Sequence, residues 1–532
     1  MRLERLPEYV TITLVTALGI AFAVFAGRYA GSGQIGLILM VLGAVAVLSV
    51  AVALRRSIWL FIPAAWILGG QIPIIPLPFA VKDIIIGFVF ASYCVFVALK
   101  IVRTKPKITF LDLLLFANLL YLTITFLRNP VGVEALGSER VGGRPYFNVF
   151  MAVLAYLVLR RVTPTYRELA ALPWLVTGMA YAIGVLNLVA YVVPWTAPIL
   201  GGIYTGVSQD AYFKDSALGG GDSEKNRLNQ LSDSGITATG LLCALYRPMT
   251  LLMPWFPGRF IVFTASMLAV VFSGHRSALL AVMIIFAIAS YYRGRIRDAM
   301  HLGMAGGVML FVLVLAQGRI IELPFAIQRT LSWMPGEWNH QAVADAQGST
   351  EWRLEMWKIA LKDSGYINDK LLGDGFGFTK WDLAVINQSE VARRLGLGNQ
   401  LDYQESAMRV GNYHSGPITT LKFVGVVGSI LYYALIFGIA VYAHRLILRA
   451  RGTPYFFAAL FIGIPLVHFP FTYIVVFGAF DAALPTTIFG LGVIQAFERG
   501  LDAIVKLEPP TTVSRKPVAI ERQRPLVTRV LH

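Results

Sequence analysis

Four basic residues lie at the ends of long apolar segments, where their side chains could act on an anionic substrate. Arg144 lies in Gly-Gly-Arg-Pro-Tyr, Arg276 in Ser-Gly-His-Arg-Ser, Arg353 in Glu-Trp-Arg-Leu-Glu and His414 in Asn-Tyr-His-Ser-Gly. A guanidinium group binds phosphate oxygens through two parallel hydrogen bonds and stays charged in a low-dielectric site. An imidazole titrates near neutral pH and can take a proton from a hydroxyl group. These residue types together favour a phosphate-bearing ligand and a general base.

Each of these residues also has a structural interpretation. An arginine at a membrane end can extend to the surface or pair with a carboxylate such as Glu351 or Glu355. His414 could be a hydrogen-bonded structural histidine. The seven histidines show no ligand-like spacing, so we expect no catalytic metal. The Gly-rich run that begins at Gly373 lacks a strand–helix context and is interpreted as a bend rather than a nucleotide-binding loop.

Membrane helices must position these residues, because the chain is 56% hydrophobic and only 14% charged. A bilayer core of roughly 30 Å requires about 20 apolar residues for each helical crossing. About fourteen segments meet or approach that length. The predicted spans are Tyr9–Ala26, Gln34–Leu54, Ser57–Pro73, Ile84–Leu99, Phe110–Leu127, Tyr146–Leu159, Ala171–Val193, Gly235–Tyr246, Phe260–Phe272, Ser277–Tyr292, Leu302–Ala316, Pro417–Tyr442, Tyr455–Phe477 and Ala482–Phe497.

Charge gives the expected orientation, because Lys and Arg collect in cytoplasmic links. A cytoplasmic N-terminus places 26 of the 46 basic residues on the cytoplasmic side, but only 9 of the 30 acidic ones. The high pI is therefore explained by topology, and we expect no nucleic-acid partner. Cys94 and Cys243 fall in separate spans and predict neither a disulfide nor a metal site.

The sequence thus predicts an all-α polytopic membrane protein with 12 to 14 transmembrane helices and both termini in the cytoplasm. Residues 1–318 would hold the first eleven spans and residues 416–497 the last three. Residues 319–415 would form one large periplasmic loop with amphipathic helices, and residues 498–532 a basic, disordered tail attracted to membrane lipids.

One helix of the loop is expected around Arg353. Ser349 or Thr350 would cap it, Leu354, Trp357 and Leu361 would share an apolar stripe, and it would end near Gly365. Arg353 would then lie in the first turn, where the helix dipole disfavours a cation unless an anion binds there.

Three motifs resemble those of the O-antigen ligase and O-antigen polymerase superfamily. The first is the turn around Ser273-Gly-His-Arg-Ser. The second is Arg353-Leu-Glu-Met-Trp, followed by Leu371-Leu-Gly-Asp-Gly-Phe-Gly. The third is His414-Ser-Gly-Pro at the end of the loop. Their order and spacing agree with the family over roughly Asn226 to Ile439, although Ser415 stands where members commonly have Asn.

The resemblance implies a glycosyltransferase of the inner membrane that acts at the periplasmic face. Its donor would be a glycan on undecaprenyl diphosphate, and its acceptor a hydroxyl of another glycan or of the lipid A core. Arg276 and Arg353 would stabilise the diphosphate, and His414 would be the general base. Reaction with inversion, without a cofactor or metal, is implied. Candidate substrate-binding residues are Arg144, Arg227, His275 and Trp357.

Two other classes stay open at the level of sequence. A lipid-linked glycan transporter would carry its charged residues along a midplane pathway between internal repeats. No such repeat is visible in this chain. A cell-wall glycan polymerase of the shape, elongation and division type would need a catalytic carboxylate in an outer loop. Asp374 is the nearest candidate, and a turn residue is the better interpretation.

Overall fold

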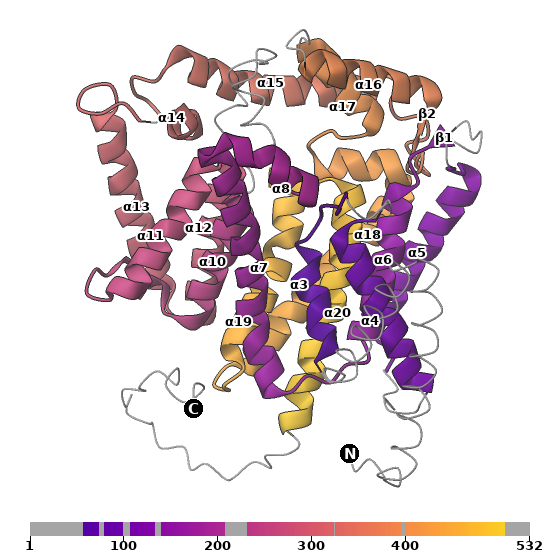
Figure 1. Cartoon of the computed structure of the whole chain (residues 1–532), viewed down its shortest axis with the longest axis horizontal. Coiled ribbons are helices and arrows are strands. Elements are labelled where there is room, and N and C mark those ends of the chain that lie inside the picture. Colours follow the sequence, from indigo (N-terminus) through magenta and orange to yellow (C-terminus); the bar gives the residue numbers. More distant parts are fainter. Residues whose placement is uncertain are drawn as a thin grey trace, which may run out of the picture.

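The computed structural model describes residues 57–73, 79–98, 107–132, 140–207, 231–323, 325–332, 334–394 and 400–505, which are mostly helical (Figure 1). Seven of the described helices are long and apolar enough to cross a membrane. They are α4 (Val81–Ala98), α5 (Phe110–Arg128), α7 (Tyr166–Val192), α13 (Ile296–Ala316), α18 (Gly416–Ala450), α19 (Phe456–Phe471) with its π-helical extension η5 (Thr472–Val476), and α20 (Phe480–Val505).

Shorter apolar helices complete this part of the bundle. They are α6 (Arg144–Leu159), α10 (Leu231–Leu245), α11 (Pro257–Phe272) and α12 (Arg276–Tyr292). All of these helices, long and short, overlap spans predicted from the sequence. The chain is therefore a multi-pass, mainly helical membrane protein.

One predicted span has a different structure, and two others lie outside the residues that the structure describes. The spans Tyr9–Ala26 and Gln34–Leu54 fall outside the described residues. The segment 57–73 is not one helix. It forms η1 (Ile58–Leu60) and α3 (Phe61–Trp66) and is then non-helical. Gly70 explains the change, because a Cβ there would lie 2.4 Å from the amide nitrogen of Gly206.

The helices begin where local signals place them. Capping boxes start α5 at Thr109 and α7 at Thr165, each with an acidic residue three positions on that returns a hydrogen bond. Pro145 and Pro417 occupy the first turns of α6 and α18, where a missing N–H costs nothing. At the other end of the chain, α20 continues past the predicted boundary at Phe497 to Val505.

Arginines cap neighbouring helices at one end of the bundle, which we call the basic face. Arg293 donates to the carbonyls of Cys243 and Ala244 at the end of α10. Likewise Arg451 donates to the last carbonyl of α12, and Arg499 to the last carbonyl of α6 at 2.6 Å. Cations are favourable there because the final carbonyls of a helix carry partial negative charge. These basic residues, which the sequence analysis used only to assign an orientation, thus also join helices.

The opposite end, the loop face, is covered by the segment between α13 and α18 (Figure 1). It contains α14 (Phe325–Leu331), α15 (His340–Lys362), α16 (Lys380–Arg394) and α17 (Gln400–Val410), and also β2 (Phe378–Thr379), which pairs antiparallel with β1 (Arg140–Val141). The segment has its own small core. That core consists of Met356, Ala360, Ile367, Ala407, Met408 and Tyr413.

The helix that carries Arg353 is longer than predicted. Its N-cap is Asn339, whose side chain accepts from the Gln341 amide at 2.9 Å, not Ser349 or Thr350. Arg353 therefore lies in the middle of α15, so the helix-dipole argument does not apply to it. The predicted stripe is also wrong, because Leu354 and Leu361 are exposed while Met356 and Ala360 are fully buried. Packing against α17 and Tyr413, which local periodicity does not reveal, selects that face.

Candidate functional site

Arg276 begins α12 at the loop face. The α11–α12 turn is short because Gly274 adopts φ +68° and the Ser273 hydroxyl donates to the Val270 carbonyl at 2.6 Å. His275 is the N-cap of α12, without a side-chain capping bond. A cation in the first turn of a helix faces the positive end of the dipole. Arg276 occupies this unfavourable position in the structure, whereas the sequence analysis expected Arg353 to occupy it.

Arg353 is half-buried, and its Nε is buried without a hydrogen-bond partner. Among the residues that the structure describes, no carboxylate forms an ion pair with it. Glu351 and Glu355, the partners considered from the sequence, are exposed. Burial lowers the pKa of the Arg353 guanidinium, and the positive charge of Arg276 lowers it further. Two cations thus lie within electrostatic reach of each other, and Arg353 has no counter-ion from the described chain.

His414 lies beside Arg353, at the junction of the loop and α18. Its ring centroid is 5.5 Å from those of Trp352 on α15 and Phe477 after η5. Burial, and to a smaller extent the charge of Arg353, lowers the pKa of His414 from 6.5 to about 4. The imidazole is therefore neutral at pH 7 and able to accept a proton.

The backbone of His414 is unusual. Its φ of +50° is the only positive value at a non-glycine residue in the described chain. Such conformations cost of order 1–3 kcal/mol and persist only where the surroundings fix them. Nearby, the indole Nε1 of Trp357 donates to the Tyr413 carbonyl at 2.7 Å. Gly416 also allows α18 to start against Tyr473, because a Cβ there would lie 2.1 Å from the Tyr473 carbonyl oxygen.

A segment of the loop, residues 368–375, holds α15 against the bundle, and we call it the strap. It inserts where α18 is broken at Gly425, whose φ is +63° and ψ −169°. Backbone hydrogen bonds of 2.8–3.2 Å join the strap to the break. They run from the amides of Asp374 and Gly375 to the carbonyls of Lys422 and Phe423, and from the amides of Val426 and Val427 to the carbonyls of Lys370 and Leu371. The strap thus satisfies groups that a broken helix would leave unpaired.

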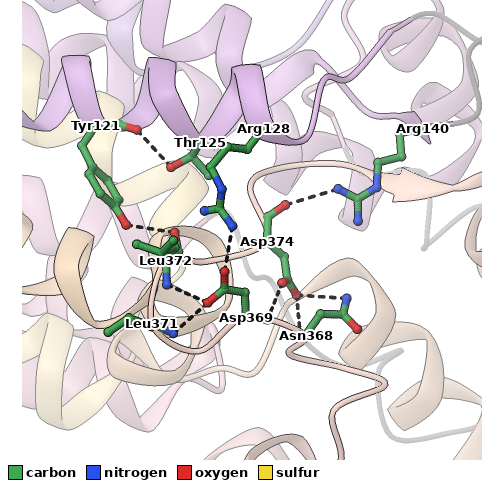
Figure 2. Close-up of polar contacts among 9 residues, drawn as sticks. All are labelled: Tyr121, Thr125, Arg128, Arg140, Asn368, Asp369, Leu371, Leu372 and Asp374. Carbon is green, nitrogen blue, oxygen red and sulfur yellow. Dashed lines mark hydrogen bonds and ion pairs between the residues drawn. The ribbon is translucent and has the colours of Figure 1, made fainter.

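Side chains reinforce the strap from both neighbouring helices. Asp374 forms a buried ion pair with Lys422 of α18 at 2.8 Å. Its carboxylate also accepts from the amides of Asn368 and Asp369 (Figure 2). On α5, Arg128 pairs with Asp369 at 2.7 Å, and the Tyr121 hydroxyl donates to the Leu372 carbonyl at 3.0 Å. The arrangement fixes the end of the Arg353 helix against the helix that follows His414.

The Gly-rich run beginning at Gly373 is a bend, as predicted. Gly373 and Gly375 adopt φ values of +82° and +73°. A Cβ on Gly373 would lie 2.5 Å from the backbone of Val424 and Gly425, so only glycine permits this contact. Asp374 is a turn residue here, because its carboxylate binds Lys422 and the two strap amides.

Arg353 lies within electrostatic reach of both Arg276 and His414, although the three residues are far apart in the sequence. Arg144 forms an ion pair with Asp83 of α4. Trp357 contacts the Tyr413 carbonyl, and His275 flanks Arg276. Arg227 lies outside the described residues.

Sequence reasoning missed Trp352 and Phe477, the aromatic rings beside His414. Trp352 is adjacent to Arg353 and could have been noted, but Phe477 comes from another helix and carries no local signal. The described residues also contain no group of three or more His, Cys, Asp or Glu side chains able to hold a metal ion. No protein-family model matches the chain, and no curated protein matches it at a significant level.

Proposed function

We propose that this chain is an integral-membrane glycosyltransferase of the O-antigen ligase and polymerase type. It would transfer a glycan from an undecaprenyl diphosphate carrier to an acceptor hydroxyl. The observation that carries the proposal is Arg353, a half-buried cation without a counter-ion among the described residues and within electrostatic reach of Arg276 and His414. A buried charge is costly unless it is paired. An anionic ligand would supply the missing partner, and a diphosphate matches two adjacent guanidinium groups.

The chemistry assigns one role to each kind of residue. The acceptor oxygen attacks the anomeric carbon of the donor and forms the new glycosidic bond. The bond from that carbon to the diphosphate oxygen breaks, and the electron pair leaves with the diphosphate. Arg276 and Arg353 stabilise the negative charge that develops there. The hydroxyl proton passes to the neutral imidazole of His414. Direct displacement inverts the configuration at the anomeric carbon.

The position of the site supports a donor held in the membrane. His414 precedes the first turn of α18, and Arg276 starts α12, so both lie where apolar helices meet the loop face. A polyprenyl chain could remain among lipids while its diphosphate reaches the arginines. The positive-inside rule favours a cytoplasmic basic face and thus a periplasmic active site on the inner membrane.

Two rival functions are less well supported by the geometry. One feature, the broken helix α18, would suit a transporter, because the substrate sites of transporters are often formed by discontinuous helices. At this break, however, the backbone groups of α18 that could bind a substrate or an ion already form hydrogen bonds with the strap. A carboxylate-dependent polymerase would need Asp374, which is occupied by Lys422 and strap amides.

Purified protein, a synthetic polyprenyl-diphosphate glycan and two acceptors would test the proposal. Lipid A core as the acceptor identifies a ligase, and a second lipid-linked glycan identifies a polymerase. Arg353→Lys keeps the charge but loses the planar fork, so transfer should fall substantially. Arg319→Gln, which changes an exposed arginine after α13, is the matched control. Transfer to neither acceptor, or full activity of Arg353→Lys, would contradict the proposal.

A further inference from the structure

One hydrogen bond joins the helix that carries Arg353 to the loop that carries His414. Trp357 follows Arg353 by one helical turn on α15, so the two side chains leave the same side of the helix. Its indole Nε1 donates to the carbonyl of Tyr413 at 2.7 Å, and the next residue is His414. The bond therefore crosses directly between the two halves of the site.

The imidazole of His414 is packed between aromatic rings but receives no hydrogen bond from the described residues. Among the described residues none forms a hydrogen bond with its ring, and the ring contacts are those with Trp352 and Phe477. The His414 amide donates to Asn412 at 3.4 Å, a long bond. A general base is commonly oriented by a third group that binds its ring. Here the orientation must come from the backbone.

The residue before His414 is itself firmly placed. Tyr413 is fully buried and packs with Met356 and Met408 in the core of the loop. Its carbonyl is the acceptor of the Trp357 bond, so the peptide between Tyr413 and His414 is held by α15. That peptide sets φ of His414, which is +50° and has no steric reason to persist unless it is held.

We infer that Trp357 is a positioning residue: its indole N–H holds the Tyr413–His414 peptide so that the imidazole stays at a fixed distance from Arg353. This inference rests on the proposed function for the role of His414. It replaces the substrate-binding role that the sequence suggested for Trp357. A displacement of about 1 Å in a catalytic group can lower turnover about 100-fold, so one hydrogen bond is sufficient to matter.

Trp357→Phe in the full-length protein removes the N–H and keeps an aromatic ring. We expect kcat for transfer to fall roughly 10- to 100-fold, while the donor KM and the affinity for inorganic pyrophosphate stay within twofold of wild type. The pKa of His414, measured by NMR of labelled histidine, should rise because the imidazole moves away from Arg353. Trp338→Phe is the matched control, since its Nε1 also donates to a backbone carbonyl of the loop, that of Met334, at 2.7 Å.

Should Trp357→Phe fail to fold, 3-benzothienylalanine at position 357 keeps the indole shape and replaces the N–H with sulfur. A kcat equal to that of Trp338→Phe, or an unchanged His414 pKa, overturns the inference. Equal losses of kcat and pyrophosphate affinity overturn it as well, because they indicate a substrate contact. If wild-type protein neither transfers glycan nor binds pyrophosphate, the proposed function fails, while the pKa of His414 still tests the tether separately.

Discussion

The arginines of the basic face and Arg353 at the loop face serve different purposes. At the basic face, Arg293, Arg451 and Arg499 each donate to carbonyls at the end of a neighbouring helix. At the loop face, Arg353 has a buried Nε that meets no acceptor in the described part of the chain, and it feels the charge of a second cation, Arg276. The same side chain is therefore structural where the fold supplies its acceptors and available to a ligand where it does not. Residue type and membrane side alone do not make this distinction.

The largest expected effect concerns the base rather than the arginines. His414→Ala should lower the rate of transfer about 10²- to 10⁴-fold, because the proposed mechanism assigns the acceptor proton to His414. Pyrophosphate binding should stay close to wild type, since the diphosphate is held by Arg276 and Arg353. Single-turnover transfer and calorimetry measure the two quantities. Near-normal transfer by this variant would remove His414 from the mechanism.

Matched substitutions at the two faces test the comparison directly. Arg353→Gln should weaken pyrophosphate binding about 10- to 100-fold, since a hydrogen bond to a charged group contributes about 1.5–3 kcal/mol. Its unfolding free energy should not fall, because the repulsion from Arg276 is relieved. Arg293→Gln should bind pyrophosphate normally but lose roughly 1–2 kcal/mol of stability, since the end of α10 loses its donors.

Calorimetry and thermal unfolding in the same detergent would give both quantities for both variants. If Arg353→Gln loses unfolding free energy and Arg293→Gln loses pyrophosphate affinity, the roles assigned to the two faces are reversed.

The strap supplies a structural contrast that involves no charge. Gly425→Ala should lower stability by roughly 2–5 kcal/mol, because its backbone conformation excludes other residues and the new methyl group would be overpacked. That methyl group would lie 2.4 Å from the Leu371 carbonyl oxygen. Gly452→Ala is the control, since Gly452 also has positive φ (+80°) but open space around it. It should cost only about 1 kcal/mol. Equal melting temperatures for the two variants would indicate that the strap does not hold the break.

The sequence predicted features that depend on neighbouring residues in the chain, and it missed features that depend on contacts between distant segments. Hydropathy is local, so the positions of the long apolar helices and of the covering loop followed from it. The end of α3 at Trp66, the buried face of α15 and the break at Gly425 were missed. Each depends on a distant partner: Gly206 and Tyr204 for the first, α17 and Tyr413 for the second, and the strap for the third.

For the site, charge on the face expected to be poor in basic residues singled out Arg276, Arg353 and His414, and Arg353 lies within electrostatic reach of the other two. It also singled out Arg144, which is compensated by Asp83. Counting charges along a chain cannot show which of them meet a partner across helices. That partner, rather than the side of the membrane, separates a structural arginine from one that is free to bind a ligand.

A smaller effect is expected in the pH dependence. The folded pKa of His414 is about 4 and the ordinary value is 6.5, so the unfolded chain takes up a proton between these values and the folded chain does not. Stability from this group is complete above pH 6.5 and is lost as the pH falls toward 4. For the same reason kcat/KM should stay level from pH 7 to about pH 5.

Removing the charge of Arg353 should raise the pKa of His414, so the acid limb of kcat/KM in Arg353→Gln should move to higher pH. Bound diphosphate should act in the same direction on kcat of the wild-type protein, because it neutralises the arginines. If the acid limb stays at the same pH in Arg353→Gln, the charge of Arg353 does not influence the pKa of His414.

The smallest expected effect is that of a chelator. In the proposed reaction the arginines of the loop face supply the positive charge that metal ions provide to many phosphate-binding enzymes. Pre-incubation with EDTA, followed by transfer in metal-free buffer, should leave the rate within twofold of the untreated protein. Added magnesium should not rescue Arg353→Gln. If the chelator stops the reaction and a divalent cation restores it, Arg276 and Arg353 are not the main source of charge stabilisation. The contrast between the two faces would then have to rest on a bound ion instead of an unpaired guanidinium.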